Sequence, residues 1–137
     1  ESQYGGTSTV IVSVIVKEGD IFNVASLEKI KRVNDEILFH PSVRRALVSS
    51  IAQRKSKVAK GHAGGTVDVS ALMWPKIDTT PEGIERLKQN IYTNDLYNGA
   101  LVSKDGKAAM IIADCWPDID YTEFFNFMQQ LKQKEED

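Results

Sequence analysis

The sequence is poor in the residues that build reactive or cross-linked sites. Cysteine occurs once, at Cys115, and histidine twice, at His40 and His62, in 137 residues. One cysteine cannot form an intramolecular disulfide, and with no base near it in the sequence it is more typical of a packed thiol than of a nucleophile. Neither histidine belongs to a motif that pairs it with a second functional group. Catalysis would therefore require the fold to bring a histidine beside Cys115 or beside the aspartates that flank it.

Long apolar runs and an excess of positive charge are also missing. The longest apolar stretch, TVIVSVIV, is far shorter than the roughly 20 residues that span a bilayer, and the opening letters ESQYGG do not form a signal peptide. The net charge of -2 disfavours a general nucleic-acid binder, because neutralising phosphates requires clustered cations. We expect a soluble segment of one domain, which could be part of a longer membrane protein.

Two short stretches contain ligand-type residues but lack the rest of a motif. Asp114, Asp118 and Asp120 fall within seven residues, without the alternating aspartates and distal glutamate of a calcium loop. A turn after Pro117 accounts for Asp118, and a helix cap accounts for Asp120. The letters GHAGG lack the order of a dinucleotide-binding motif and the lysine of a phosphate-binding loop. We predict no metal site, no cofactor and no catalytic residue, so the protein is not expected to be an enzyme.

The first third of the sequence predicts a strand, a helix and a second strand. Residues 8–17 are mostly β-branched and continuously apolar, which is typical of a central strand buried on both faces. Asn23 is placed to cap a helix that ends before Pro41. The buried stripe of this helix is expected to contain Leu27, Ile30, Val33 or Asn34, and Ile37. Residues 43–52 return to strand-like composition.

The middle of the sequence changes character. Residues 53–65 hold three glycines and several cations, and we expect a basic, glycine-rich insertion that forms a mobile loop or an extended solvated ribbon. The cations of RKSKVAK are more typical of a solvated loop, but they could contact anionic lipid head groups if the domain stood near a membrane. Apolar character returns in TVDVSALMWP.

The remaining segments predict two helices separated by a hairpin. Thr80 and Pro81 mark a helix start, with Ile84, Leu87 and Ile91 as its buried stripe. Asp105-Gly106 predicts a two-residue turn in a hairpin over residues 101–112. Asp120 with Glu123 resembles a capping box. The helix that follows is expected to pack through Tyr121, Phe124, Phe127, Met128 and Leu131.

The order of these elements predicts a single α+β domain over residues 1–137. The simplest arrangement is a ferredoxin-like β-α-β sandwich, in which a mixed or antiparallel sheet of about four strands carries its helices on one face. Large apolar side chains most often belong to the core, but an apolar ligand groove remains open as an alternative. The candidate substrate-facing residues are Trp74, Trp116, Phe124, Phe127 and Met128.

Several stretches in their order resemble one family of membrane transporters. They are an apolar strand after YGG, then DIFNVASLEKIKRVNDEI, HPSVRRALVSS and, after the insertion, PEGIERLKQNIYTNDLYNGALVSKDGKAAMIIAD. Over residues 4–131 the chain is similar to the first extracytoplasmic domain of resistance-nodulation-division (RND) exporters, closest to the MMPL-type and predicted lipid exporters. The most specific part is residues 90–112, where an Asn-Asp step, a Tyr and Gly, and LVS-DG precede an apolar strand.

The resemblance implies a periplasmic porter domain of a proton-driven exporter in the bacterial inner membrane, which passes hydrophobic or lipid-like substrates. Its partners would be the transmembrane helices and a second periplasmic domain of the same chain. The family's proton-relay carboxylates lie in membrane helices, so no Asp or Glu here takes that role, and the resemblance transfers no substrate-contact residue. The basic insertion departs from the family. The family usually continues into another strand after the last helix, and a chain ending earlier is expected to expose a sheet edge or an apolar helix face, both of which favour homo-oligomers.

Two other functions are consistent with this topology. A free-standing ferredoxin-like module could bind or sense a small ligand and dimerise. An RNA-binding domain would need exposed aromatic residues on its central strands, and residues 8–16 contain none. The first alternative predicts a short gene product with no membrane helices.

Overall fold

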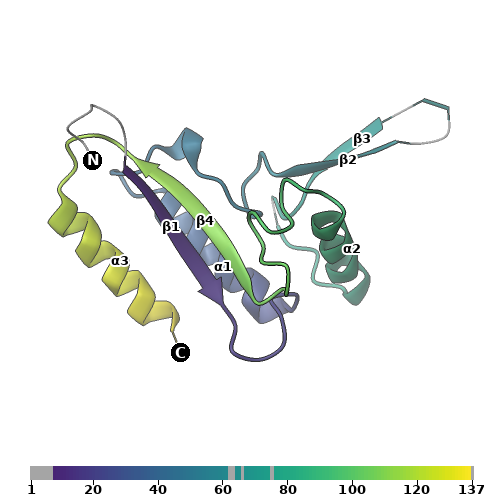
Figure 1. Cartoon of the computed structure of the whole chain (residues 1–137), viewed down its shortest axis with the longest axis horizontal. Coiled ribbons are helices and arrows are strands. Elements are labelled where there is room, and N and C mark those ends of the chain that lie inside the picture. The colour runs from purple at the N-terminus through teal and green to yellow at the C-terminus, as the bar shows by residue number, and fades with distance from the viewer. Residues whose placement is uncertain (1–7, 62–63, 66, 75, 137) are drawn as a thin grey trace.

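The computed structural model describes residues 8–61, 64–65, 67–74 and 76–136 of the chain (Figure 1). Its elements, in chain order, are β1 (Ser8–Ile15), α1 (Val24–Leu38), the 3-10 turn η2 (Arg45–Leu47), β2 (Lys57–Gly61), β3 (Val67–Ala71), α2 (Pro81–Tyr92), β4 (Ala108–Cys115) and α3 (Tyr121–Glu135). The strands form two antiparallel pairs, β1 with β4 and β2 with β3. The α+β class is confirmed, whereas a single sheet of four strands is wrong. In the described ranges, no helix has the length and hydropathy needed to cross a membrane.

β1 lies at the edge of its sheet. It pairs with β4 from Ser8 opposite Cys115 to Ile15 opposite Ala108. The side chains of Ile11 and Ile15 are 61% and 68% exposed, while Val14 in between is buried. The prediction of a central strand buried on both faces is therefore wrong. A β-branched run predicts a strand, but the helices that cover only one face of this sheet decide which half of its side chains is buried.

The prediction of a continuous strand over residues 43–52 is wrong. Its backbone touches β4 at two isolated bridges, Val43 with Cys115 and Ser49 with Ile112, and forms η2 between them. The Ser49 N–H donates to the Ile112 carbonyl at 2.8 Å, and the Ile112 N–H donates to the Ser49 carbonyl at 2.9 Å. β4 is consequently flanked on both sides, by β1 and by this interrupted segment.

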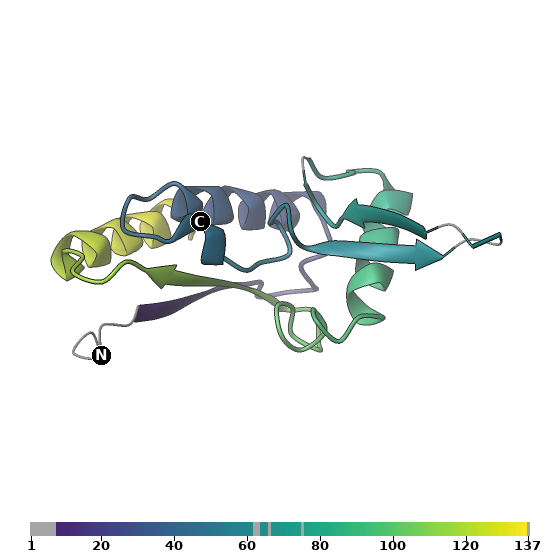
Figure 2. The ribbon, with the colours of Figure 1, turned by 90° about the horizontal axis from the view of Figure 1, so that it is seen from above.

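α1 and α3 form a layer on one face of the β1–β4 sheet, as Figure 2 shows. The Asn23 side chain caps α1 as predicted, accepting a hydrogen bond from the Ser26 N–H at 2.8 Å. Val33 and Asn34, which the sequence left as alternatives, are both buried. The predicted placement of helices on one face holds for α1 and α3, whereas α2 lies beside the other strand pair.

In its described part, the predicted insertion begins with turns and continues as an extended strand at Lys57–Gly61. β2 belongs to it and pairs with β3, and Figure 1 shows this two-stranded arm projecting away from the β1–β4 sheet. Val67 and Val69 of the arm are exposed. At its base the Tyr97 hydroxyl donates to the Lys57 carbonyl at 2.7 Å, and burial raises the pKa of this phenol. His62 lies outside the described residues.

α2 begins as predicted and packs through part of the expected stripe. The Thr80 hydroxyl accepts the Gly83 N–H at 3.0 Å, and Pro81 occupies the first turn, where its missing N–H costs no helical bond. Leu87 and Ile91 are buried, and Ile84 is half-buried against the core.

The Asp105-Gly106 step turns the chain into β4, but the turn is longer than predicted. The type I′ turn that is typical of an Asp-Gly pair needs positive φ at both residues, and only Gly106 has it, at 76°. The Gly106 N–H donates to the Ser103 carbonyl at 3.0 Å, and the Ser103 N–H to the Ala108 carbonyl at 2.9 Å, which encloses a four-residue loop. The first arm of the hairpin is reduced to a bridge between Val102 and Ala109.

α3 starts at the predicted cap, where Asp120 accepts the Glu123 N–H at 3.0 Å. Phe124 and Leu131 are buried in the core. Tyr121 is exposed, contrary to its predicted place on the buried face. The helix packs against α1, and its Phe127 and Met128 side chains are half-buried against the core.

Candidate functional site

Three of the five candidate substrate-facing residues lie on α3 and serve mainly to pack it. The Phe124 and Phe127 rings contact the imidazole of His40, with centroid distances of 5.1 and 4.3 Å. The His40 Nδ1 accepts the Ser42 N–H at 3.0 Å, so one nitrogen of the ring is engaged in the turn after α1. Met128 is half-buried against the same core. This aromatic cluster joins α3 to the end of α1.

A shallow hollow of about 450 Å³ opens next to this cluster. It is lined by Arg32, Asp35, Glu36, Phe39 and Phe127. Two ion pairs lie near its walls: Arg32 binds Glu135 through two hydrogen bonds of 2.9 and 3.2 Å, and Lys134 binds Glu36 at 2.9 Å. Arg32 also holds the pKa of the Glu135 carboxyl below its usual value. The hollow therefore combines charged side chains with two phenylalanine rings.

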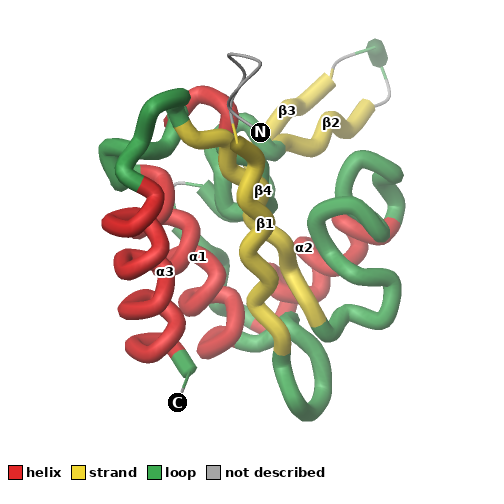
Figure 3. The backbone as a smooth tube through the Cα atoms, turned by 60° about the vertical axis from the view of Figure 1, so that its left-hand side comes forward, coloured by secondary structure: helices red, strands yellow, loops and turns green. Residues whose placement is uncertain are grey.

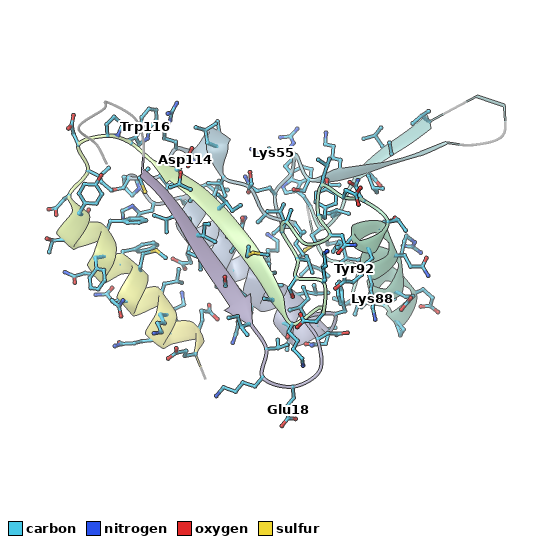
Figure 4. All side chains as sticks on the ribbon, in the orientation of Figure 1. Glu18, Lys55, Lys88, Tyr92, Asp114 and Trp116 are labelled. Carbon is cyan, nitrogen blue, oxygen red and sulfur yellow. The ribbon has the colours of Figure 1, made fainter. Side chains whose placement is uncertain are left out.

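The two tryptophans lie elsewhere and share one arrangement. The guanidinium of Arg44 lies over the Trp116 ring, and that of Arg54 over the Trp74 ring, each 4.8 Å from the centroid. Both rings are exposed. Figure 4 places Trp116 at the end of β4, beside Asp114. The structure therefore does not join the tryptophans to the α3 cluster in one substrate path.

Two exposed aromatic residues, Phe39 and Phe125, were not singled out in the sequence. Phe39 ends α1, is 63% exposed, and carries the guanidinium of Arg45 at 5.2 Å from its centroid. The Lys55 ammonium donates to the Ala46 carbonyl at 3.1 Å, which brings a third cation to the same turn. The sequence shows two adjacent arginines, Arg44 and Arg45. The fold decides which aromatic rings their guanidinium groups stack on.

The three aspartates and Cys115 have structural roles in the fold. Asp114 accepts the Thr9 hydroxyl at 2.8 Å, Asp118 has a φ of 65° in the turn, and Asp120 caps α3. Cys115 is fully buried, as expected of a packed thiol, and burial followed by the charge of Asp114 raises its pKa. In the part of the chain that the structure describes, no three His, Cys, Asp or Glu side chains are grouped to hold a metal.

No family model matches the sequence, and neither a curated protein nor a solved structure is significantly similar to it. The functional proposal consequently rests on the resemblance noted in the sequence together with the geometry of this chain.

Proposed function

We propose that the chain is a periplasmic porter domain of a proton-driven RND exporter of the MMPL-like and predicted lipid exporter branch. In this proposal the exporter lies in the bacterial inner membrane and passes hydrophobic or lipid-like molecules. The domain supplies no catalytic residue and no cofactor site. Its partners are the transmembrane helices and a second periplasmic domain of the same chain.

The observation that carries the proposal is the order of three extended segments. β1 leads through α1 to residues 42–49, and β4 lies between β1 and those residues, antiparallel to both. A strand placed between two parallel segments that a helix connects is the split β-α-β unit of ferredoxin-like folds. α3 follows β4 and lies beside α1, as Figure 3 shows from the side. This arrangement supports the ferredoxin-like architecture that the family resemblance implies.

The opposite face of the β1–β4 sheet offers a surface for the rest of such a transporter. Ile11 and Ile15 are exposed on it, and they lie opposite Ile112 and Ala108 of β4. Exposed apolar sheet faces of this kind are common where another domain packs. The second periplasmic domain of the exporter is the partner that the proposal assigns to this face.

The free edge of β1 supports the same assignment. The Val16 N–H donates to the Lys107 carbonyl at 2.9 Å, and in an antiparallel ladder every second residue faces the partner strand. The N–H and C=O groups of Thr9, Ile11 and Ser13 therefore point away from β4. The strand has no charged residue to discourage pairing. Without its partner domain, this edge would favour homo-oligomers.

The test is the native gene on both sides of this segment. An apolar helix of roughly 20 residues just before Glu1, with further membrane helices after Asp137, is expected. Stop codons or polar, helix-free sequence on both sides would overturn the exporter assignment. The free-standing ligand-binding module would then become the leading candidate.

A further inference from the structure

The charges of this chain are strongly segregated. Between Glu36 and Asp68 the sequence holds six Lys and Arg and no acidic residue, although the chain as a whole has a net charge of -2. All 19 Asp and Glu therefore lie outside this stretch. The net charge of the whole chain therefore does not reveal this local excess of positive charge.

The fold gathers part of this charge around η2. We name this surface the basic rim and define it by the cations Arg44, Arg45 and Lys55 and the apolar side chains Phe39, Leu47 and Trp116. The hydrogen bond from Lys55 to Ala46 brings its ammonium to the turn that carries both arginines. Within the described ranges, none of the three cations forms an ion pair with a carboxylate. Asp114 is the nearest acidic neighbour along β4, and its carboxylate accepts a hydrogen bond from Thr9.

Apolar side chains are exposed among these cations. Trp116 is 49% exposed beneath the Arg44 guanidinium, Phe39 is exposed beneath Arg45, and Leu47 is exposed in η2 itself. Cations on long apolar stems beside aromatic rings suit the boundary between lipid head groups and acyl chains. A soluble anion would pair with the cations but would leave the exposed leucine and rings in water. The combination therefore favours an anionic bilayer.

The location of the rim agrees with this partner. Ser8, where β1 begins, pairs with Cys115, the residue before Trp116, so the rim lies at the end of the sheet where β1 starts. Figure 4 shows Trp116, Asp114 and Lys55 along the same side of the molecule. This step alone rests on the proposed function, in which a membrane helix leads into β1 at that end.

We propose that the basic rim binds the surface of an anionic phospholipid bilayer. Arg44, Arg45 and Lys55 contact the lipid phosphates, while Phe39, Leu47 and Trp116 lie among the head groups. Each cation near an anionic surface contributes about 1 kcal/mol, which corresponds to roughly a fivefold change in affinity. The contact is electrostatic and is expected to weaken as salt is added.

The test is sedimentation of the 137-residue chain with vesicles of phosphatidylcholine, with and without phosphatidylglycerol. The wild-type chain is expected to bind the mixed vesicles at low salt and to remain free of neutral ones. Replacing both arginines (Arg44→Gln with Arg45→Gln) should weaken binding about 30-fold. The matched control, Arg86→Gln with Lys104→Gln, makes the same charge change away from the rim and should bind like the wild type. Far-ultraviolet circular dichroism checks that both variants fold.

A second readout reports on the rim directly. The chain has two tryptophans, so a Trp74→Phe variant leaves Trp116 as the only indole. Its emission should shift to shorter wavelength with anionic vesicles and stay unchanged with neutral ones. Absence of binding at low salt, equal weakening by both double variants, or a shift produced by soluble polyphosphate but not by vesicles would each overturn the proposal. The gene sequence tests the exporter assignment separately, so failure of one does not imply failure of the other.

Discussion

Asn34 is the polar side chain whose removal should cost the fold most. It lies on the buried stripe of α1 and is 1% exposed. Its Oδ1 accepts the Ser50 hydroxyl at 2.7 Å, and its Nδ2 donates to the Gln53 Oε1 at 3.2 Å. These bonds attach the irregular chain after η2 to α1. We expect Asn34→Ala to destabilise the protein without changing its fold.

The expected loss of stability follows from the polar groups that Asn34→Ala leaves without their partners. The Ser50 side chain is fully buried, so its hydroxyl loses the acceptor it has in Asn34 and is not exposed to bulk solvent, which costs about 1–3 kcal/mol. Loss of the bond to Gln53 adds about 0.5–1 kcal/mol. Alanine favours the helix over asparagine by about 0.6 kcal/mol, which offsets part of the loss. The net decrease in the free energy of unfolding should be about 2 kcal/mol.

Urea unfolding followed by circular dichroism measures this change. The matched control is Asn126→Ala, the same substitution at an exposed site on α3, which should leave stability unchanged or slightly raised. The double variant with Ser50→Ala should cost less than the sum of the single variants, because it removes the stranded hydroxyl. A loss at Asn34 no larger than that at Asn126, or strict additivity with Ser50, would refute the reasoning.

Three further predictions address the turn, the helix pair and the thiol. Gly106→Ala should lower the free energy of unfolding by about 1–2 kcal/mol in chemical denaturation, because φ is 76° and a Cβ there would lie 3.1 Å from the Tyr92 hydroxyl. The control is Gly61→Ala, which should be nearly neutral because a Cβ there meets nothing within 4 Å. Glu135→Gln should cost about 0.5–1 kcal/mol at pH 7. Since the folded pKa of Glu135 is lowered, this contribution is present above its unfolded pKa of about 4.3 and is lost as pH falls through the folded pKa; a cost that persists in acid would contradict the ion-pair explanation. The buried Cys115 thiol, whose pKa is raised, should react with a thiol reagent at neutral pH much more slowly than in urea, and equal rates would show that the site is accessible.

Different surfaces of the described structure are expected to bind different partners. The open face and free edge of β1 suit another protein domain, whereas the basic rim suits a charged surface. The hollow beside α1 and α3 is lined by both charged and aromatic side chains.

The candidate site was only partly predictable from the sequence. Phe124 could be assigned to the core because its spacing with Leu131 follows the helical repeat. The stacking of Arg44 on Trp116 joins residues far apart in the chain, and no local pattern indicates it. Phe39 went unnoticed because a single aromatic residue at the end of a helix has no periodicity.

The starts of the helices follow from the local sequence. The caps Asn23, Thr80 and Asp120 act on N–H groups three residues away, so their effect is local and survives whatever packs around them. The pairing and burial of the strands depend instead on tertiary packing. Ile11 pairs with Ile112 across a hundred residues, and its exposure depends on which face the helices cover. Sheet pairing and burial are set by contacts between distant segments, which local composition does not encode.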